Sequence, residues 1–192
     1  MKIVALVQAR MGSTRLPGKV LKSIVSKPMI ELLLTRLSQS KKLDEIVVAA
    51  SEELKNDKLE SVVKSLGYKC TRGSEKDVLN RFYESAKSAG ADVIVRITGD
   101  CPLVDSGLVD ECIQGYINSK VDYFSNVDPL SYPDGLDIEV MSFKSIERVN
   151  NETDSEFDRE HVTPYIRNSD SFSKSSMQHT KDLSAQRWSV DE

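Results

Sequence analysis

The residues with the clearest chemical character lie near the start of the chain, in the stretch RMGSTRLPGKV at residues 10–20. A phosphate loop of the ATPase type needs four residues between its glycines and a Ser or Thr after the lysine. Here five residues separate Gly12 from Gly18, and Val20 follows Lys19. The stretch is therefore not such a loop, but its cations, hydroxyls and accessible backbone amides suit a polyphosphate.

Three cations in this stretch, Arg10, Arg15 and Lys19, stand out because the chain as a whole is acidic. Its net charge is -4 at pH 7, whereas a nucleic-acid-binding protein usually presents a broad basic face. The sequence therefore predicts a small anionic partner and no nucleic acid. The alternative interpretation is an ordinary solvated basic loop.

Two carboxylates are candidates for a metal site. Asp100 lies in the stretch TGDCPL at residues 98–103, which directly follows the apolar run DVIVRI at residues 92–97, and Asp191 follows another short apolar segment. Mg²⁺ in proteins is bound by one or two carboxylates together with phosphate oxygens. A purely structural alternative is that Asp100 caps the next helix, although Asp105 stands closer to it. The interest of Asp191 depends on whether its strand lies beside the one that ends at Asp100.

The pattern of apolar residues predicts the elements that position these side chains. Short continuous apolar runs at residues 3–7, 45–50 and 92–97 are typical of strands buried on both faces. They alternate with helical spacings, as in Ile30, Leu33, Leu34 and Leu37. Such alternation predicts a doubly wound sheet, with ligands at the carboxyl ends of its strands.

The second half of the chain is less regular. It predicts helices at 106–118, 143–150 and 156–167, and strands at 121–124, 136–141, 172–177 and 187–190. The run 136–141 alternates like a half-exposed strand, so the sheet is expected to be mixed. The prediction is one domain over residues 1–192, an α/β fold with a three-layer α/β/α, mostly parallel but mixed sheet.

Composition excludes several classes of protein. The chain has no apolar run near the roughly 20 residues that a membrane helix needs, and it starts in a short strand instead of a signal peptide. The three cysteines, Cys70, Cys101 and Cys112, fit neither a disulfide framework nor a zinc cluster. We therefore expect free thiols, no membrane association and a cytoplasmic location.

Six stretches, in order along nearly the whole chain, resemble a known family. They are QARMGSTRLPGKVL, RGSEKDVLNRF, ADVIVRITGDCPLVD, YPDGLDIEV, REHVTPYIR and RWSVDE. They are similar to the cytidylyltransferases that activate acidic sugars, typified by the KDO and acylneuraminate enzymes, and above all to the spore coat polysaccharide (SpsF) group. The first and third stretches are the most specific.

The resemblance implies a Rossmann-like nucleotide-diphospho-sugar transferase fold and assigns roles to named residues. The implied nucleotide-binding residues are Ala9, Arg10, Gly12, Ser13, Arg15, Lys19 and Arg72, with Arg15, Lys19 and Asp100 acting in catalysis. The implied Mg²⁺ ligands are Asp100 and Asp191, and the implied substrate-binding residues are Asp134, Asp137, Glu139 and His161. Structural alternatives remain open for three of these assignments. Asp-Gly turns arise for structural reasons, a lone helical His often only packs, and Arg72 stands beside Ser74 and Asp77, which resemble the capping box of the next helix.

The implied reaction is attack by a sugar hydroxyl on the α-phosphorus of CTP, with release of pyrophosphate. The sugar would be an acidic or keto sugar, in surface or spore-coat polysaccharide biosynthesis. Other hypotheses are an inactive nucleotide-binding protein of the same fold, a transferase that uses another nucleotide, and a glycosyltransferase, which commonly has an Asp-x-Asp motif that is absent here.

The resemblance also bears on assembly and on the end of the chain. It implies a homodimer built from residues around 125–180. Members of the family generally continue past the final matching motif, so the chain is expected to be either a fragment or a naturally shortened form.

Overall fold

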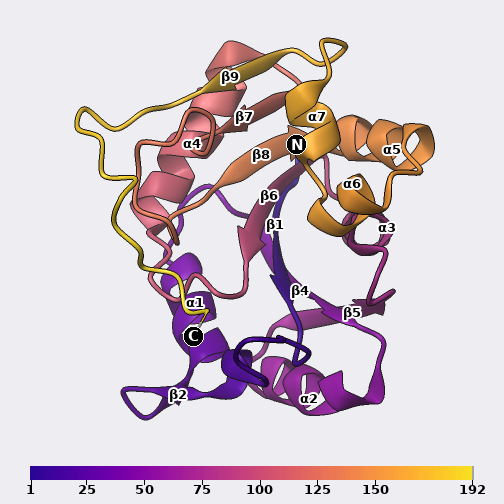
Figure 1. Cartoon of the computed structure of the whole chain (residues 1–192), viewed down its shortest axis with the longest axis vertical. Helices are drawn as coiled ribbons and strands as arrows, with labels where there is room; N and C mark the ends of the chain where they lie inside the picture. Colours follow the sequence, from indigo (N-terminus) through magenta and orange to yellow (C-terminus); the bar gives the residue numbers. More distant parts are fainter. Residues whose placement is uncertain (192) are drawn as a thin grey trace.

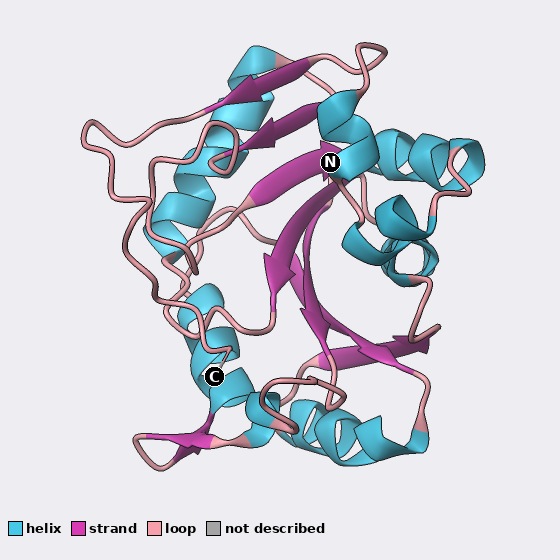
Figure 2. Cartoon of the chain, in the orientation of Figure 1, coloured by secondary structure: helices cyan, strands magenta, loops and turns pink. Residues whose placement is uncertain are grey.

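The computed structural model describes residues 1–191, and these form a central sheet covered by helices on both faces (Figures 1 and 2). The sheet strands are β1 (Ile3–Ala9), β4 (Glu45–Ser51), β5 (Lys69–Gly73), β6 (Val93–Thr98), β7 (Tyr123–Ser125), β8 (Glu139–Ser142) and β9 (Lys174–Ser176). A separate small hairpin pairs β2 (Ser23–Ile24) with β3 (Lys27–Pro28). The helices are α1 (Met29–Leu37), α2 (Asp57–Ser65), α3 (Val78–Ala89), α4 (Ser106–Ser119), α5 (Phe143–Glu152), α6 (Glu156–His161) and α7 (Pro164–Asn168).

The strands are ordered β5-β4-β1-β6-β8-β7-β9 in the described part of the chain. Strands β5, β4, β1 and β6 are parallel to one another, whereas β8 runs antiparallel to both β6 and β7. The predicted fold class, a mostly parallel but mixed α/β sheet, is confirmed.

The alternation of side chains along β1 builds two cores, one on each face of the sheet. Val4 and Leu6 pack into the core beneath α3, α5 and α7, while Ala5 and Val7 pack into the core beneath α1, α2 and α4. All four side chains are fully buried. A strand covered by helices on both faces is apolar on both sides, which explains the continuous apolar run at residues 3–7 of β1.

The chain reverses its direction of winding at β1, and this creates the crevice that the sequence predicts. From β1 the connection passes through α1 to β4 on one side, while β6 lies on the other side, with Gln8 opposite Thr98. Ligands of open α/β sheets bind outside the carboxyl ends of strands at such a reversal. The loops that follow Ala9 and Thr98 therefore meet there.

Two expected elements differ in the structure. The predicted helix at 156–167 is divided into α6 and α7, because Val162 adopts φ +74° between them and Pro164, which has no N–H, starts the second helix. The predicted strand at 187–190 is wrong: only an isolated bridge joins Arg187 to Asp134. That segment is extended but makes no continuous ladder, because its hydrogen bonds go to two separate loops.

Three further predictions can be compared with the structure: the start of β8, the state of the cysteines and the presence of a membrane-spanning helix. Strand β8 begins at Glu139, three residues later than the predicted start, because Leu136 and Ile138 hydrogen-bond to the side-chain amide of Asn126 and not to a neighbouring strand. Cys70, Cys101 and Cys112 are free thiols, as predicted. Among the helices of residues 1–191, none combines the length and apolar character that a membrane span requires.

Candidate active site

The loop after β1 is folded back on itself so that it presents its cations to the crevice. Gly18 takes φ +70°, a conformation that glycine adopts readily, and its N–H donates to the carbonyl of Met11 at 2.9 Å. The N–H of Met11 in turn donates to Oδ1 of the buried Asn56 at 2.8 Å. The short helical turn Lys19–Leu21 follows, and Lys19 is its first residue.

The loop after β6 lies against the end of β1 because a glycine permits close approach. The N–H of Gly99 donates to the carbonyl of Gln8 at 2.8 Å, and a Cβ added to Gly99 would stand only 2.6 Å from that oxygen. Any larger residue would push the two loops apart. Gly99 thereby brings the next residue, Asp100, beside the cationic loop.

Lys19 joins the two predicted metal carboxylates. Its Nζ lies 3.1 Å from Oδ2 of Asp100 and 2.7 Å from Oδ1 of Asp191, and its side chain is only 11% exposed. Arg15 adds a further contact of 3.2 Å to Oδ2 of Asp191. The hydrogen bond from Lys19, assisted by Arg187 and Arg15, lowers the pKa of Asp191 from 3.8 to about 2 despite its partial burial. Asp191 is therefore ionised at neutral pH.

Asp191 reaches this position through an extended C-terminal segment, residues 186–191, which we call the strap. In Figure 1 the chain runs down from β9 beside α4 and ends near α1. The N–H of Trp188 donates to the carbonyl of Asp134 at 2.7 Å, and the N–H of Val190 donates to the carbonyl of Asp100 at 2.9 Å. Backbone bonds of the strap thus set the two carboxylates side by side, although the predicted strand is absent.

These groups surround a cavity of about 310 Å³, which we call the phosphate cavity. Its walls are Gln8, Ala9, Arg10, Ser13, Thr14, Arg15, Lys19, Val20, Thr98, Gly99, Asp100, His161 and Asp191. It therefore brings together most of the predicted nucleotide-binding residues and both predicted metal ligands. Arg10 is oriented by Glu75, whose Oε1 accepts from Nη1 of Arg10 at 3.2 Å.

A second cavity of about 350 Å³, which we call the acceptor cavity, shares Thr98 and His161 with the first. Two of the predicted substrate-binding residues, Asp137 and Glu139, line it. Burial raises the pKa of Asp137 to about 6, with a contribution from the charge of Asp134.

Glu139 is almost fully buried and is not a free recognition group. It forms an ion pair with Arg96 and accepts a hydrogen bond of 2.5 Å from the hydroxyl of Tyr123. Burial alone would raise the pKa of Glu139, but the charge of Arg96 and the Tyr123 hydrogen bond outweigh it, so the pKa is lowered. The carboxylate therefore stays charged inside the fold.

Arg72, a predicted nucleotide-binding residue, lies outside both cavities. Its guanidinium donates to the carbonyls of Ser51 and Glu53, at 2.6 and 2.9 Å, and pairs with Asp57 and Glu60. These contacts join β5 to the region that leads into α2. The geometry thus gives Arg72 a structural role in holding these elements together.

Gly12 and Asp134 are likewise absent from the walls of the two cavities. Gly12 belongs to the cationic loop beside Lys55 and Glu75. The carboxylate of Asp134 accepts from the hydroxyl of Ser189 at 2.8 Å and thus faces the strap.

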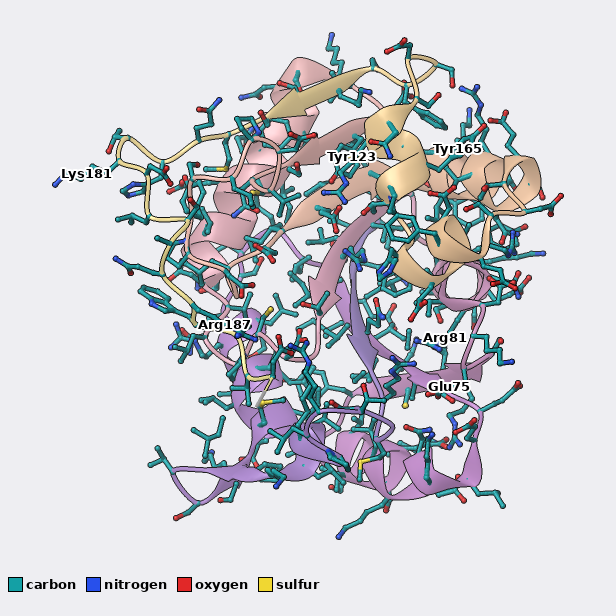
Figure 3. The ribbon with its side chains drawn as sticks, viewed as in Figure 1. Glu75, Arg81, Tyr123, Tyr165, Lys181 and Arg187 are labelled. Carbon is teal, nitrogen blue, oxygen red and sulfur yellow. The ribbon has the colours of Figure 1, made fainter. Side chains whose placement is uncertain are left out.

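Sequence reasoning missed three charged residues of the site, Arg96, Arg167 and Arg187. Arg96 and Arg167 line the acceptor cavity, and Arg187 holds Asp191 through a contact of 2.6 Å. A signal existed for Arg96, since it is the one charge inside the otherwise apolar run VIVRIT. Figure 3 shows Arg187 on the C-terminal segment, and it shows Glu75 with Arg81 near β5.

Fold and site together define a nucleotidyltransferase with a Rossmann-like sheet. The sequence model of the family "Cytidylyltransferase" matches residues 4–191. The chain belongs to this family, so it is a CTP-dependent nucleotidyltransferase, and the resemblance described above is confirmed.

Three known proteins illustrate the relationship. An uncharacterized protein of Methanocaldococcus jannaschii is 43% identical over 166 residues, which cover 86% of this chain and 67% of the relative. The spore coat polysaccharide biosynthesis protein SpsF of Bacillus subtilis is 39% identical over 173 residues, covering 86% of this chain and 70% of that protein. A solved cytidylyltransferase from Leptospira borgpetersenii superposes with a TM-score of 0.96 at 34% identity, covering 100% of this chain and 82% of that one.

Proposed function

We propose that the protein transfers CMP from CTP to an acidic or keto sugar, releasing pyrophosphate, in the biosynthesis of a surface polysaccharide. One observation carries the proposal: the cationic loop and the carboxylates Asp100 and Asp191 meet in one cavity, and a second cavity shares Thr98 and His161 with it. The similarity to SpsF, a spore coat polysaccharide biosynthesis protein, supports the polysaccharide pathway.

The phosphate cavity is suited to the triphosphate of CTP. Arg10, Arg15 and Lys19 are the cations in its wall, and Ser13 adds a hydroxyl. Charge-assisted hydrogen bonds contribute roughly 1.5–3 kcal/mol each. Negative charge spreads over the phosphate oxygens as nucleotidyl transfer proceeds, so fixed cations stabilise the transition state more than the ground state.

The carboxylates of Asp100 and Asp191 fit a divalent cation. Both lie within 3.1 Å of one positively charged atom, Nζ of Lys19, so a cation can contact both carboxylates at once. Two carboxylates, completed by phosphate oxygens and water, are a usual ligand set for Mg²⁺. We propose that these residues hold Mg²⁺, which would neutralise phosphate charge when bound.

The acceptor cavity is placed for the sugar. It meets the phosphate cavity at Thr98 and His161, so a hydroxyl at this junction would lie beside the bound nucleotide. Arg167 in its wall could pair with a sugar carboxylate. In the reaction the hydroxyl oxygen bonds to the α-phosphorus while the bond from that phosphorus to the pyrophosphate oxygen breaks.

The predicted homodimer would be tested separately, by light scattering of the purified protein.

The direct test is pyrophosphate release from each of the four nucleoside triphosphates, with Mg²⁺ and a panel of acidic and neutral sugars. We expect release from CTP with one acidic or keto sugar, and its loss in Asp100→Asn. A matched control is Asp110→Asn, because Asp110 caps backbone amides near Lys41 away from both cavities. Binding of CTP without turnover by any sugar in the panel would contradict the proposed transfer.

A further inference from the structure

Arg187 lies between two carboxylates that come from different parts of the chain. Its guanidinium is 2.6 Å from Oδ2 of Asp191 and 3.6 Å from Oδ2 of Asp134. The hydroxyl of Ser189 donates to the same oxygen of Asp134 at 2.8 Å. We call these four residues the clasp. Figure 3 shows the labelled Arg187 where the C-terminal segment approaches the body of the protein.

The clasp lies where two backbone segments, the turn at Gly135 and the strap at Ser189, are already in close contact. Gly135 has φ +104°, and a Cβ added to it would stand 2.6 Å from the backbone nitrogen of Ser189. The strap therefore packs directly against the turn that carries Asp134, and the two N–H bonds between Asp134 and the strap measure 3.0 and 2.7 Å. The position of Asp134 relative to Arg187 is thus set by backbone contacts.

Through the clasp, the two oxygens of Asp191 are given different partners. Oδ2 faces Arg187 and also lies 3.2 Å from the guanidinium of Arg15, whereas Oδ1 faces Lys19 at 2.7 Å. Charges alternate along the row Asp134, Arg187, Asp191, Lys19 and Asp100. A carboxylate held in this way keeps a fixed orientation in the wall of the phosphate cavity.

We propose that Arg187 is a positioning residue of the transferase, and that Asp134 acts through it instead of binding the sugar. This inference rests on the proposed function, because it assigns Asp191 to the metal. Groups that orient a metal ligand contribute to metal affinity, and their loss typically lowers it by about 10- to 100-fold. Exposed ion pairs contribute little to global stability, so the effect is expected on the site and not on the fold.

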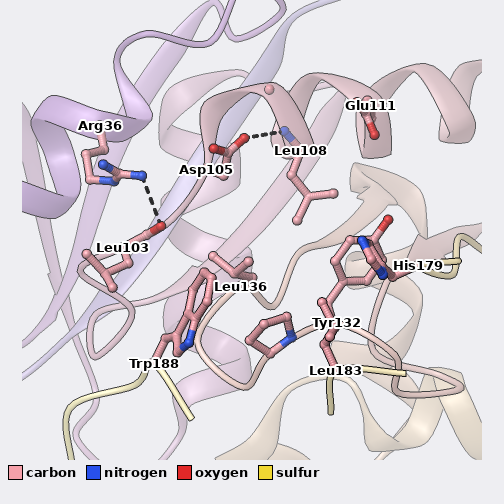
Figure 4. A pocket seen from close by; sticks show the side chains of 12 residues that line it. Arg36, Leu103, Asp105, Leu108, Glu111, Tyr132, Leu136, His179, Leu183 and Trp188 are labelled. Atoms are coloured by element: carbon pink, nitrogen blue, oxygen red, sulfur yellow. Dashed lines mark hydrogen bonds between the residues drawn. The ribbon is translucent and has the colours of Figure 1, made fainter. Parts of the chain in front are cut away.

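The single tryptophan of the chain, Trp188, lies on the strap and reports on it directly. It is 41% exposed and borders the cavity drawn in Figure 4, beside Leu103 and Leu136. Release of the strap would move its emission to longer wavelength and raise its quenching by acrylamide, by up to about 2-fold if exposure becomes complete. This measurement needs neither nucleotide nor metal.

The experiment compares Arg187→Gln, Asp134→Asn, the double variant and Arg187→Lys. Arg148→Gln is the matched control, because Arg148 also pairs with an acid four residues on, Glu152, at 2.7 Å. Two quantities are measured: Trp188 fluorescence of the unliganded protein, and binding of Mn²⁺ by electron paramagnetic resonance with CTP present and sugar absent.

We expect Arg187→Gln and Asp134→Asn each to increase Trp188 quenching and to weaken Mn²⁺ binding about 10-fold, with a double variant no worse than either single one. Arg187→Lys should recover most of the affinity, and the control should match the wild type. Unchanged Trp188 fluorescence in both single variants would overturn the clasp. Changed fluorescence with unchanged Mn²⁺ affinity would overturn the positioning role.

Failure of the proposed function gives a different result. In that case the wild type itself would bind no Mn²⁺ in the presence of CTP, while Trp188 quenching would still separate the variants. The positioning role would then be overturned together with the proposed function, and the clasp would stand as a structural feature.

Discussion

The phosphate cavity and the acceptor cavity share a border but are built in opposite ways. In the phosphate cavity, Lys19 and Arg15, two cations of one continuous loop, contact the carboxylates Asp100 and Asp191. In the acceptor cavity, Arg96 and Glu139 neutralise each other inside the protein before any ligand arrives. The first cavity holds charges that a ligand can engage, whereas the second holds a charge pair that supports the fold.

The largest effect is expected from breaking the buried ion pair between Arg96 and Glu139. Glu139→Gln leaves the Arg96 charge buried without its counter-charge, and breaking a buried pair in this way costs about 3–5 kcal/mol of the free energy of unfolding. Urea denaturation would measure it. Glu147→Gln is the control, since that carboxylate accepts only a long hydrogen bond of 3.5 Å. Equal unfolding midpoints for Glu139→Gln and wild type would remove the contrast between the cavities.

The next effect tests the phosphate cavity. Lys19→Ala removes the cation that faces both carboxylates, and we expect kcat for pyrophosphate release to fall by about 10²–10³, as for loss of one preorganised charge-stabilising group. Initial rates at saturating CTP would measure it. Lys22→Ala is the matched control, because Lys22 is exposed and absent from the cavity wall. A loss confined to KM would mean that Lys19 binds ground and transition states alike.

A smaller effect depends on pH. Asp137 has its pKa raised from 3.8 to about 6, first by burial. The unfolded chain loses this proton at lower pH than the folded protein, so the folded state is penalised as pH rises from about 4 to 6. Asp137→Asn should therefore stabilise the protein by about 1–2 kcal/mol above pH 6 and by nothing below pH 4. Urea midpoints at pH 7.5 and pH 4 would measure this, and a gain equal at both values would contradict it.

The smallest expected effect concerns Arg72, which lies outside both cavities and should affect stability but not CTP affinity. Arg72→Gln breaks contacts to Asp57 and Glu60, outside both cavities, so we expect about 1 kcal/mol lower stability with CTP affinity unchanged. Calorimetric titration with CTP and thermal unfolding would measure the two quantities. A large loss of affinity at full stability would restore the nucleotide-binding role that the sequence predicts for Arg72.

Much of the fold was predictable because its signals are local. Continuous apolar runs identified β1, β4 and β6, since a strand covered by helices on both faces has no polar side. Turn and cap residues placed α4, whose N-cap Asp105 accepts from the N–H of Leu108 as expected. The errors arose where backbone partners lie far apart in sequence, as in the strap, which pairs with two loops and with no strand.

The sequence by itself determined the family, the parallel sheet and the cationic loop, because each of these resides in short contiguous stretches with strict residue requirements. Only the tertiary structure decided which side chains share the site. It joined Lys19 to Asp100 and Asp191 across 81 and 172 residues, separated Arg72 from the cavities, and turned Asp134 toward Arg187. Charge and hydrogen-bonding capacity can be read from a residue, but a partner's distance depends on packing of the whole chain.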